Sequence, residues 1–106
     1  MLGEAAMQIE IGRLLTLRAA IKLDAGDRAR KEVSMAKVQV ADALHKAVDT
    51  AIQLMGAQGY SRGTPLEWMY RYARQARLVD GASEVHKMVI AGQLIADRDR
   101  SFFSWP

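Results

Sequence analysis

The longest stretch of this chain without glycine or proline runs over residues 27–55 and is rich in strong helix formers. Ala, Lys, Leu, Met, Gln and Arg have high helix propensity, so this stretch is predicted to be one helix over residues 28–56. Such a helix is about 40 Å long at 1.5 Å per residue. Its apolar residues fall on more than one side, which indicates neighbours on more than one side. We therefore expect it to be the central helix.

Three further helices are predicted, over residues 4–24, 65–79 and 83–97. Thr64 as cap, Pro65 at the first helical position and Glu67 mark the start of the second of these. The first is indicated by five apolar residues at the spacing of one helix face, namely Met7, Ile11, Leu14, Leu15 and Ile21. With no strand pattern, residues 1–106 are predicted to form a single all-α domain, an up-and-down four-helix bundle that buries its apolar faces mutually.

Two connections between these helices could carry a function. Residues 56–63 hold three glycines, which permit backbone to approach a ligand or another chain closely. The same segment could equally be a simple helix connection. Asp80 lies at the break before the last helix, where a carboxylate either caps that helix or acts as a general base beside a bound ligand.

Composition narrows the possible classes of function. The fifteen basic and twelve acidic residues are mixed along the chain without a dense basic block, so we expect no nucleic-acid binding. The chain has no cysteine, and His45 and His86 have no ligand spacing around them, so we expect no metal site. No apolar run approaches the ~18 residues of a membrane span, and the N-terminus lacks a secretory signal pattern. We expect a cytoplasmic protein.

The string AIQLMGAQGYSRGTPLEWMYRYARQARLVDGASEVHKMVIAGQLI, residues 51–95, resembles the last third of acyl-CoA dehydrogenases. The likeness continues upstream and covers nearly the whole chain, with a glycine-rich "Q..GG.GY" loop and an "E-G-T" loop in the family's order. It implies the C-terminal helical domain of a larger flavoenzyme, possibly lacking its first helix. The family's N-terminal and middle domains are absent, so this chain alone is expected to be inactive and not to hold FAD.

The resemblance also implies roles for individual residues. Asp80 matches the catalytic glutamate that removes the α-proton of the acyl thioester while the β-hydride goes to the flavin, and Gly81 would lie against the thioester. Aspartate at this place resembles a subgroup related to the long-chain-specific dehydrogenases and to members ten and eleven. Two segments match residues that contact FAD in the family. The first matches contacts to the FAD of a neighbouring subunit and comprises Gln53, Leu54, Met55, Gly56 and Ala57. The second matches contacts to the adenosine side of the FAD of the same subunit and comprises Ala82, Ser83 and Glu84.

The activity implied by the resemblance is FAD-dependent oxidation of an acyl-CoA to the trans-2-enoyl-CoA. Electrons would pass to an electron-transferring flavoprotein, and the chain would assemble with itself as a dimer or tetramer. Two alternatives stay open. One is a free-standing helical module that only self-associates, and the other is a related flavoprotein that does not dehydrogenate its substrate.

Overall fold

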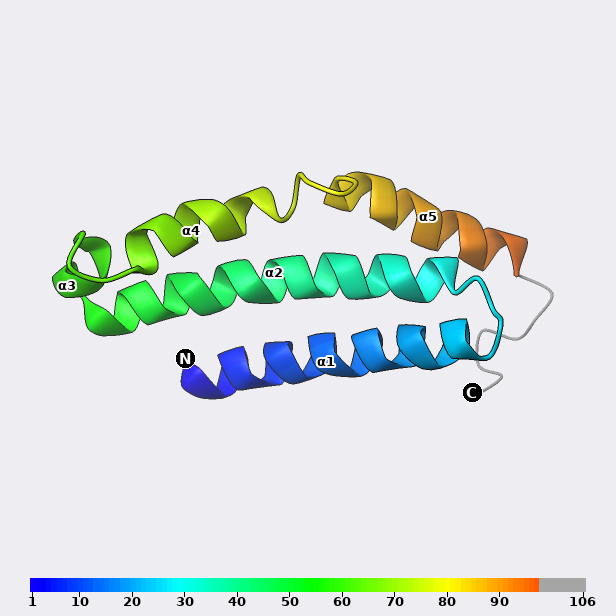
Figure 1. Cartoon of the computed structure of the whole chain (residues 1–106), viewed down its shortest axis with the longest axis horizontal. Coiled ribbons are helices and arrows are strands. Elements are labelled where there is room, and N and C mark those ends of the chain that lie inside the picture. Colours follow the sequence, from blue (N-terminus) through cyan, green and yellow to red (C-terminus); the bar gives the residue numbers. More distant parts are fainter. Residues whose placement is uncertain (98–106) are drawn as a thin grey trace.

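The computed structural model describes residues 1–97, which form helices joined by turns, with no strand among them. The all-α fold predicted from the sequence is confirmed. The helices are α1 (Leu2–Asp24), α2 (Arg30–Met55), α3 (Ala57–Tyr60), α4 (Leu66–Gln75) and α5 (Ser83–Ala96), as Figure 1 shows. The one-turn helix α3 lies in the segment for which no regular structure was predicted.

Helix α2 is the central element, as the sequence predicted. Helix α1 runs antiparallel to it on one side, and α4 and α5 follow one another along its other side (Figure 1). No Cα atom of α1 lies within 8 Å of one in α4 or α5. The described helices therefore form three layers with α2 in the middle.

The last two helices depart from the predicted up-and-down order. Both α4 and α5 run antiparallel to α2, so the chain does not reverse direction between them (Figure 1). Helix α4 has 10 residues and α5 has 14, so together they nearly match the 26 residues of α2. The helices α1, α2, α4 and α5 thus form a helical bundle of three layers, in which α4 and α5 share one layer.

The interface between α1 and α2 is built from small residues. Ala19 of α1 is buried, and a Cβ atom added to Gly12 of α1 would lie 3.1 Å from Cγ2 of Val40 on α2. Small side chains let the two helices approach closely. The larger apolar residues of α1 point elsewhere: Met7 is 64% exposed and Leu14 is 57% exposed. The prediction that this apolar face is buried within the chain is therefore wrong for the described residues.

Two helix boundaries differ from the predicted ones for local reasons. Helix α2 begins at Arg30 rather than residue 28, because Ala29 adopts a left-handed φ of 50° after Gly26 at φ 88°. The Asp27 carboxylate holds this turn by accepting a hydrogen bond of 2.7 Å from the Ala29 N–H. Helix α4 ends at Gln75 rather than residue 79, because the N–H groups of Leu78 and Val79 both turn back to the Gln75 carbonyl.

A partly buried ion pair joins the ends of α1 and α2. The Lys22 ammonium lies 2.9 Å from the Glu32 carboxylate, whose side chain is only 6% exposed. Burial raises the pKa of Glu32, but the hydrogen bond from Lys22, a backbone hydrogen bond and the charges of Lys22 and Lys31 lower it more. The net effect holds the pKa of Glu32 below its ordinary value of 4.5.

Replacing Lys22 by Met is expected to lower the free energy of unfolding by about 1–2 kcal/mol near neutral pH, because the buried Glu32 carboxylate loses the nearer of its two lysine partners. A carboxyl with a depressed pKa stabilises the fold above its unfolded pKa, and this contribution is lost as the pH falls. The deficit of Lys22→Met, measured by urea unfolding with circular dichroism, should therefore shrink below pH 4.5.

The exposed pair of Arg13 and Glu10 provides the control, since their side chains are 67% and 57% exposed. Arg13→Met should change the unfolding free energy by less than about 0.5 kcal/mol at either pH. A Lys22→Met deficit that stays constant from neutral to acid pH would contradict the assignment.

Candidate functional site

The turn between α4 and α5 carries the residues predicted to do chemistry. Asp80 has a φ of 54° and Gly81 a φ of 87°, so two successive residues adopt left-handed backbone. Aspartate tolerates this region better than most residues, and glycine adopts it without strain. Ala82 is extended and leads into α5. With this backbone conformation, the chain continues in the same direction along α2 from α4 into α5 (Figure 1).

Side chains of α2 and backbone groups fasten this turn. The Lys37 ammonium donates a hydrogen bond to the Ala76 carbonyl at the end of α4. The Ser83 N–H donates to the Arg77 carbonyl at 3.0 Å, which closes the turn on itself. The imidazole of His86 contacts the carbonyl of Asp80 through Nε2 at 3.0 Å. The turn is therefore held at Ala76 and Arg77 before Asp80, and at the carbonyl of Asp80 itself.

The Asp80 side chain, in contrast, is exposed and unpartnered. Within residues 1–97 its carboxylate makes no hydrogen bond and no ion pair. A cap of α5 by Asp80 is excluded there, because the N-cap residue is Ala82 and no side chain caps that helix. The turn thus presents a free carboxylate on a fixed backbone. Such a group can accept a proton from a ligand placed against it.

The residues that follow Asp80 lie beside it, in the turn and in the first turn of α5. Gly81 is exposed next to the ring of His86, and Ser83 is buried at the first position of α5. The Ser83 hydroxyl is buried without a hydrogen-bond partner in the described structure. Glu84 is exposed in the first turn of the same helix. Proximity groups these residues but does not establish their predicted roles.

The second predicted segment lies at the other end of α2. Gln53, Leu54 and Met55 form the last turn of that helix, and all three side chains are exposed. Gly56 follows with a φ of 65° and opens α3. Ala57 is the first residue of α3 and is exposed as well. This helix end presents backbone and side chains outward.

Helix α3 packs tightly against the end of α2 through Gly59. A Cβ atom at this glycine would lie 2.9 Å from Cβ of Met55 and 3.0 Å from the carbonyl oxygen of Ile52. No larger residue fits without moving the backbone. The glycines of this segment therefore shape a compact helical turn, where the sequence predicted an irregular loop.

The two predicted segments do not form one site within this chain. Lys37, which contacts the α4–α5 connection, precedes Gln53 by about 25 Å along α2 at 1.5 Å per residue. Figure 1 shows the connection near the middle of the molecule and α3 at its end. Within one chain, the two segments therefore contact either different parts of a ligand or two different ligand molecules.

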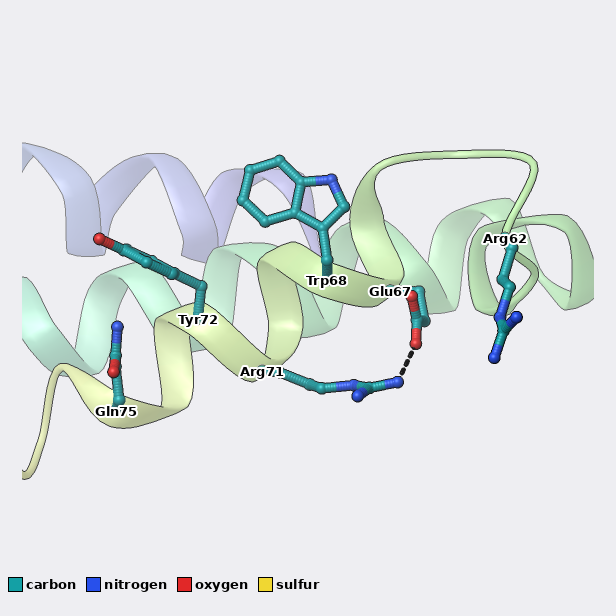
Figure 2. Close-up of a pocket in the computed structure, with 6 residues that line it drawn as sticks. All are labelled: Arg62, Glu67, Trp68, Arg71, Tyr72 and Gln75. Carbon is teal, nitrogen blue, oxygen red and sulfur yellow. Dashed lines mark hydrogen bonds and ion pairs between the residues drawn. The ribbon is translucent and has the colours of Figure 1, made fainter.

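A surface hollow on the outer side of α4 is separate from both segments. It measures about 460 Å³, and Figure 2 shows its lining. Trp68 and Tyr72 meet edge to face with ring centroids 6.4 Å apart, and they are 58% and 66% exposed. Arg71 and Glu67 form an ion pair across one turn. None of the residues predicted from the sequence to act lines this hollow.

His86, Ser34 and Lys37 are the site residues that sequence reasoning missed. The sequence indicated only that His86 has no metal-ligand spacing, and nothing marked Ser34 or Lys37 within a long helix. His86 follows Asp80 by six residues, which places it one turn into α5 and facing back to the turn. A polar residue at this offset was the available signal for His86.

Known proteins of the same fold share both the sequence and the arrangement. Residues 1–95 match the family model described as acyl-CoA dehydrogenase, C-terminal domain. Acyl-CoA dehydrogenase family member 11 of Gallus gallus is 45% identical over 101 residues, which are 93% of this chain and 13% of that protein. A 3-(aryl)acrylate reductase of Clostridium sporogenes is 37% identical over 94 residues, which are 89% of this chain and 25% of that protein.

Solved structures agree. Butyryl-CoA dehydrogenase from Megasphaera elsdenii gives a TM-score of 0.80 at 32% identity, over 85% of this chain and 24% of that one. The structure described as the FAD complex of PigA gives 0.80 at 25% identity, over 84% of this chain and 23% of that one. This chain belongs to the acyl-CoA dehydrogenase family and corresponds to its C-terminal domain. It spans a quarter or less of the length of these relatives.

Two kinds of feature are absent from the described residues. None of the helices in residues 1–97 combines the length and the apolar character needed to cross a bilayer. Over the same residues, no three His, Cys, Asp or Glu side chains gather in a way that could hold a metal ion.

Gly81→Ala is expected to destabilise the fold by about 2–3 kcal/mol, measured by urea unfolding. The new alanine would have to keep a left-handed φ of 87°, and its methyl group would lie 2.8 Å from Nε2 of His86. Gly26→Ala is the control, because its φ of 88° matches that of Gly81 and nothing lies within 4 Å of the added atom. It should cost only about 1–2 kcal/mol. Equal losses for both variants would show that the contact with His86 contributes nothing.

Proposed function

We propose that this chain supplies the catalytic base of an FAD-dependent acyl-CoA dehydrogenase, with Asp80 as that base. One observation carries the proposal: the Asp80 carboxylate has no partner in residues 1–97, while its backbone is fixed. A base needs a defined position and a free lone pair, and this turn offers both. Membership of the family supports the same role.

The reaction assigned to Asp80 is removal of one proton from the carbon next to an acyl thioester. A bound acyl-CoA covers the exposed carboxylate and excludes water from it. Gly81 has no side chain, so the thioester can approach the backbone beside the base. FAD, when bound, accepts the hydride from the β-carbon. The carboxylate keeps the α-proton, and the product is a trans-2-enoyl-CoA.

The first turn of α5 fits a hydroxyl oxygen of the cofactor. The buried Ser83 hydroxyl lacks a partner and can bond to such a group. Backbone N–H groups at a helix start attract oxygen atoms. Because the Glu84 carboxylate shares this turn, a neutral ribose oxygen fits better than a phosphate. We assign Ala82, Ser83 and Glu84 to the adenosine side of the FAD of the same subunit.

The end of α2 fits the cofactor of another copy. Gln53, Leu54, Met55, Gly56 and Ala57 lie too far from the Asp80 turn to touch the same flavin ring within one chain. Their exposure suits contact with the FAD of a neighbouring subunit in a homodimer or homotetramer.

Electron-transferring flavoprotein is the proposed electron acceptor. The absence of cysteine fits a reducing compartment, which we take to be the cytoplasm.

A reductase of the same family is the second candidate. The relative from Clostridium sporogenes, 37% identical, is named for reduction of a 3-(aryl)acrylate. In that direction the same carboxylate, protonated, would donate a proton to the α-carbon of an unsaturated acid or thioester, and reduced FAD would supply the hydride to the β-carbon. The position of Asp80 serves either direction, so the substrate and the redox partner decide between them.

Asp80→Asn should abolish bleaching of the flavin by acyl-CoA in the protein that joins this chain to the family's N-terminal and middle domains. The amide cannot accept the α-proton, so the rate of flavin reduction is expected to fall by at least about a thousandfold. Stopped-flow absorbance measures this rate. Asp24→Asn, at the exposed end of α1, is the control and should reduce at the wild-type rate.

Three results would contradict the proposal or part of it. Bleaching that survives in Asp80→Asn would show that Asp80 is not the base. Flavin that binds but is bleached by no acyl-CoA, even in the wild type, would favour the reductase. A joined protein that binds no flavin would support a helical module that serves only for association.

Gln53→Ala is expected to weaken FAD binding by about three- to tenfold, which corresponds to the loss of one hydrogen bond. Titration of the flavin-free joined protein, followed by FAD fluorescence, measures the dissociation constant. Gln58→Ala, at a nearby exposed glutamine of α3, is the matched control and should leave it unchanged. Equal weakening by both variants would remove the specific role of Gln53.

A further inference from the structure

The imidazole of His86 bridges two separate elements of the fold. Its Nε2 atom lies 3.0 Å from the carbonyl oxygen of Asp80, in the turn. Its Nδ1 atom lies 3.0 Å from Oγ of Ser34, on α2. Ser34 is 4% exposed, so this end of the bridge is buried in the packed side of the central helix. The ring therefore connects the base turn directly to the core.

The partners of the ring define its tautomer. A backbone carbonyl can only accept, so Nε2 of His86 must carry the hydrogen in the bond to Asp80. In the neutral ring Nδ1 is then an acceptor, and the Ser34 hydroxyl donates to it. Both nitrogen atoms are thereby used in one orientation. A ring turned over about its Cβ–Cγ bond would lose both bonds.

The ring and Gly81 fit together. A Cβ atom on Gly81 would lie 2.8 Å from Nε2 and 3.4 Å from Cδ2 of His86, so the ring occupies the space that a side chain would need. The left-handed φ values of Asp80 and Gly81 turn the Asp80 carbonyl toward this ring. The backbone conformation of Asp80 sets both the direction of this carbonyl and the direction of the Asp80 side chain.

We propose that His86 is a positioning residue for Asp80. The hydrogen bond from Nε2 to the Asp80 carbonyl fixes the backbone of Asp80, and so the direction in which its carboxylate meets the α-carbon of the substrate. Ser34 contributes by holding the ring in the tautomer and rotamer that can donate. This inference rests on the proposed function of Asp80 as base.

Two amide variants separate this role from simple packing. The amide nitrogen of Gln can reach the place of Nε2, so His86→Gln keeps a donor for the Asp80 carbonyl. Asn is shorter, and its amide reaches only the place of Nδ1, so His86→Asn keeps a partner for Ser34 and loses the bond to Asp80. Both variants are polar and remove the ring, which makes them matched.

The reductive half-reaction of the joined, flavin-loaded protein gives two separate quantities, the rate constant of flavin reduction and the dissociation constant of acyl-CoA. His86→Asn should reduce the flavin about 10- to 100-fold more slowly than His86→Gln, as expected for a misplaced base. Their dissociation constants for acyl-CoA should agree within about threefold, since the substrate contacts are the same. Equal rates for the two variants, or a change confined to the dissociation constant, would overturn the positioning role.

Nitrogen NMR of ¹⁵N-histidine-labelled chain gives a readout without catalysis. His86 is expected to carry its proton on Nε2, and Ser34→Ala should change the Nδ1 signal while leaving the helix content by circular dichroism the same. A ring protonated on Nδ1 alone would overturn the bridge. Asp80→Asn, run in parallel, separates the two claims. If acyl-CoA still bleaches the flavin of Asp80→Asn, the assignment of Asp80 as base fails. If Asp80→Asn is inactive and His86→Gln and His86→Asn reduce the flavin at equal rates, only the role of His86 fails.

Discussion

The attachment of the α4–α5 connection to the middle of α2 is the constraint on which the candidate site depends. Lys37 holds the end of α4, and Ser34 holds His86 at the start of α5. These contacts allow two short helices to lie end to end along one long helix. The turn between them therefore lies at the surface. Its backbone is held, and the carboxylate of Asp80 has no partner in the described residues. A fixed backbone with a free acid is what proton transfer at a defined carbon requires.

The same packing leaves much apolar surface exposed on the described helices. The buried apolar residues are small, mostly alanines such as Ala41 and Ala73, and no large side chain is fully buried in residues 1–97. Leu14 on α1 and Leu54 on α2 stay about half exposed, and so do many other large apolar residues of the described chain. Burial of such residues usually supplies most of the stability of a domain. The surfaces they form are suited to other domains of the family or to a second copy.

Sequence reasoning predicted what local chemistry determines. The run of helix formers between Gly26 and Gly56 identified the central helix, and the break at Asp80 identified the turn that carries the acid. The parallel course of α4 and α5 could not be predicted, because it follows from packing along α2. The bridge from His86 to Ser34 joins residues 52 positions apart, and no local pattern records such a pair. The resemblance supplied the roles that we propose for Asp80 and Gln53, which patterns of single residues leave open.

A crystal structure of the joined protein with FAD and a bound acyl-CoA would test the central claim most directly. The account predicts a carboxylate oxygen of Asp80 about 3–3.5 Å from the α-carbon of the acyl group, on the side opposite the flavin. The backbone carbonyl of Asp80 should still accept the hydrogen bond from His86. A different acid beside the α-carbon, or an Asp80 carboxylate that points into solvent in that complex, would contradict the assignment of the base to this domain.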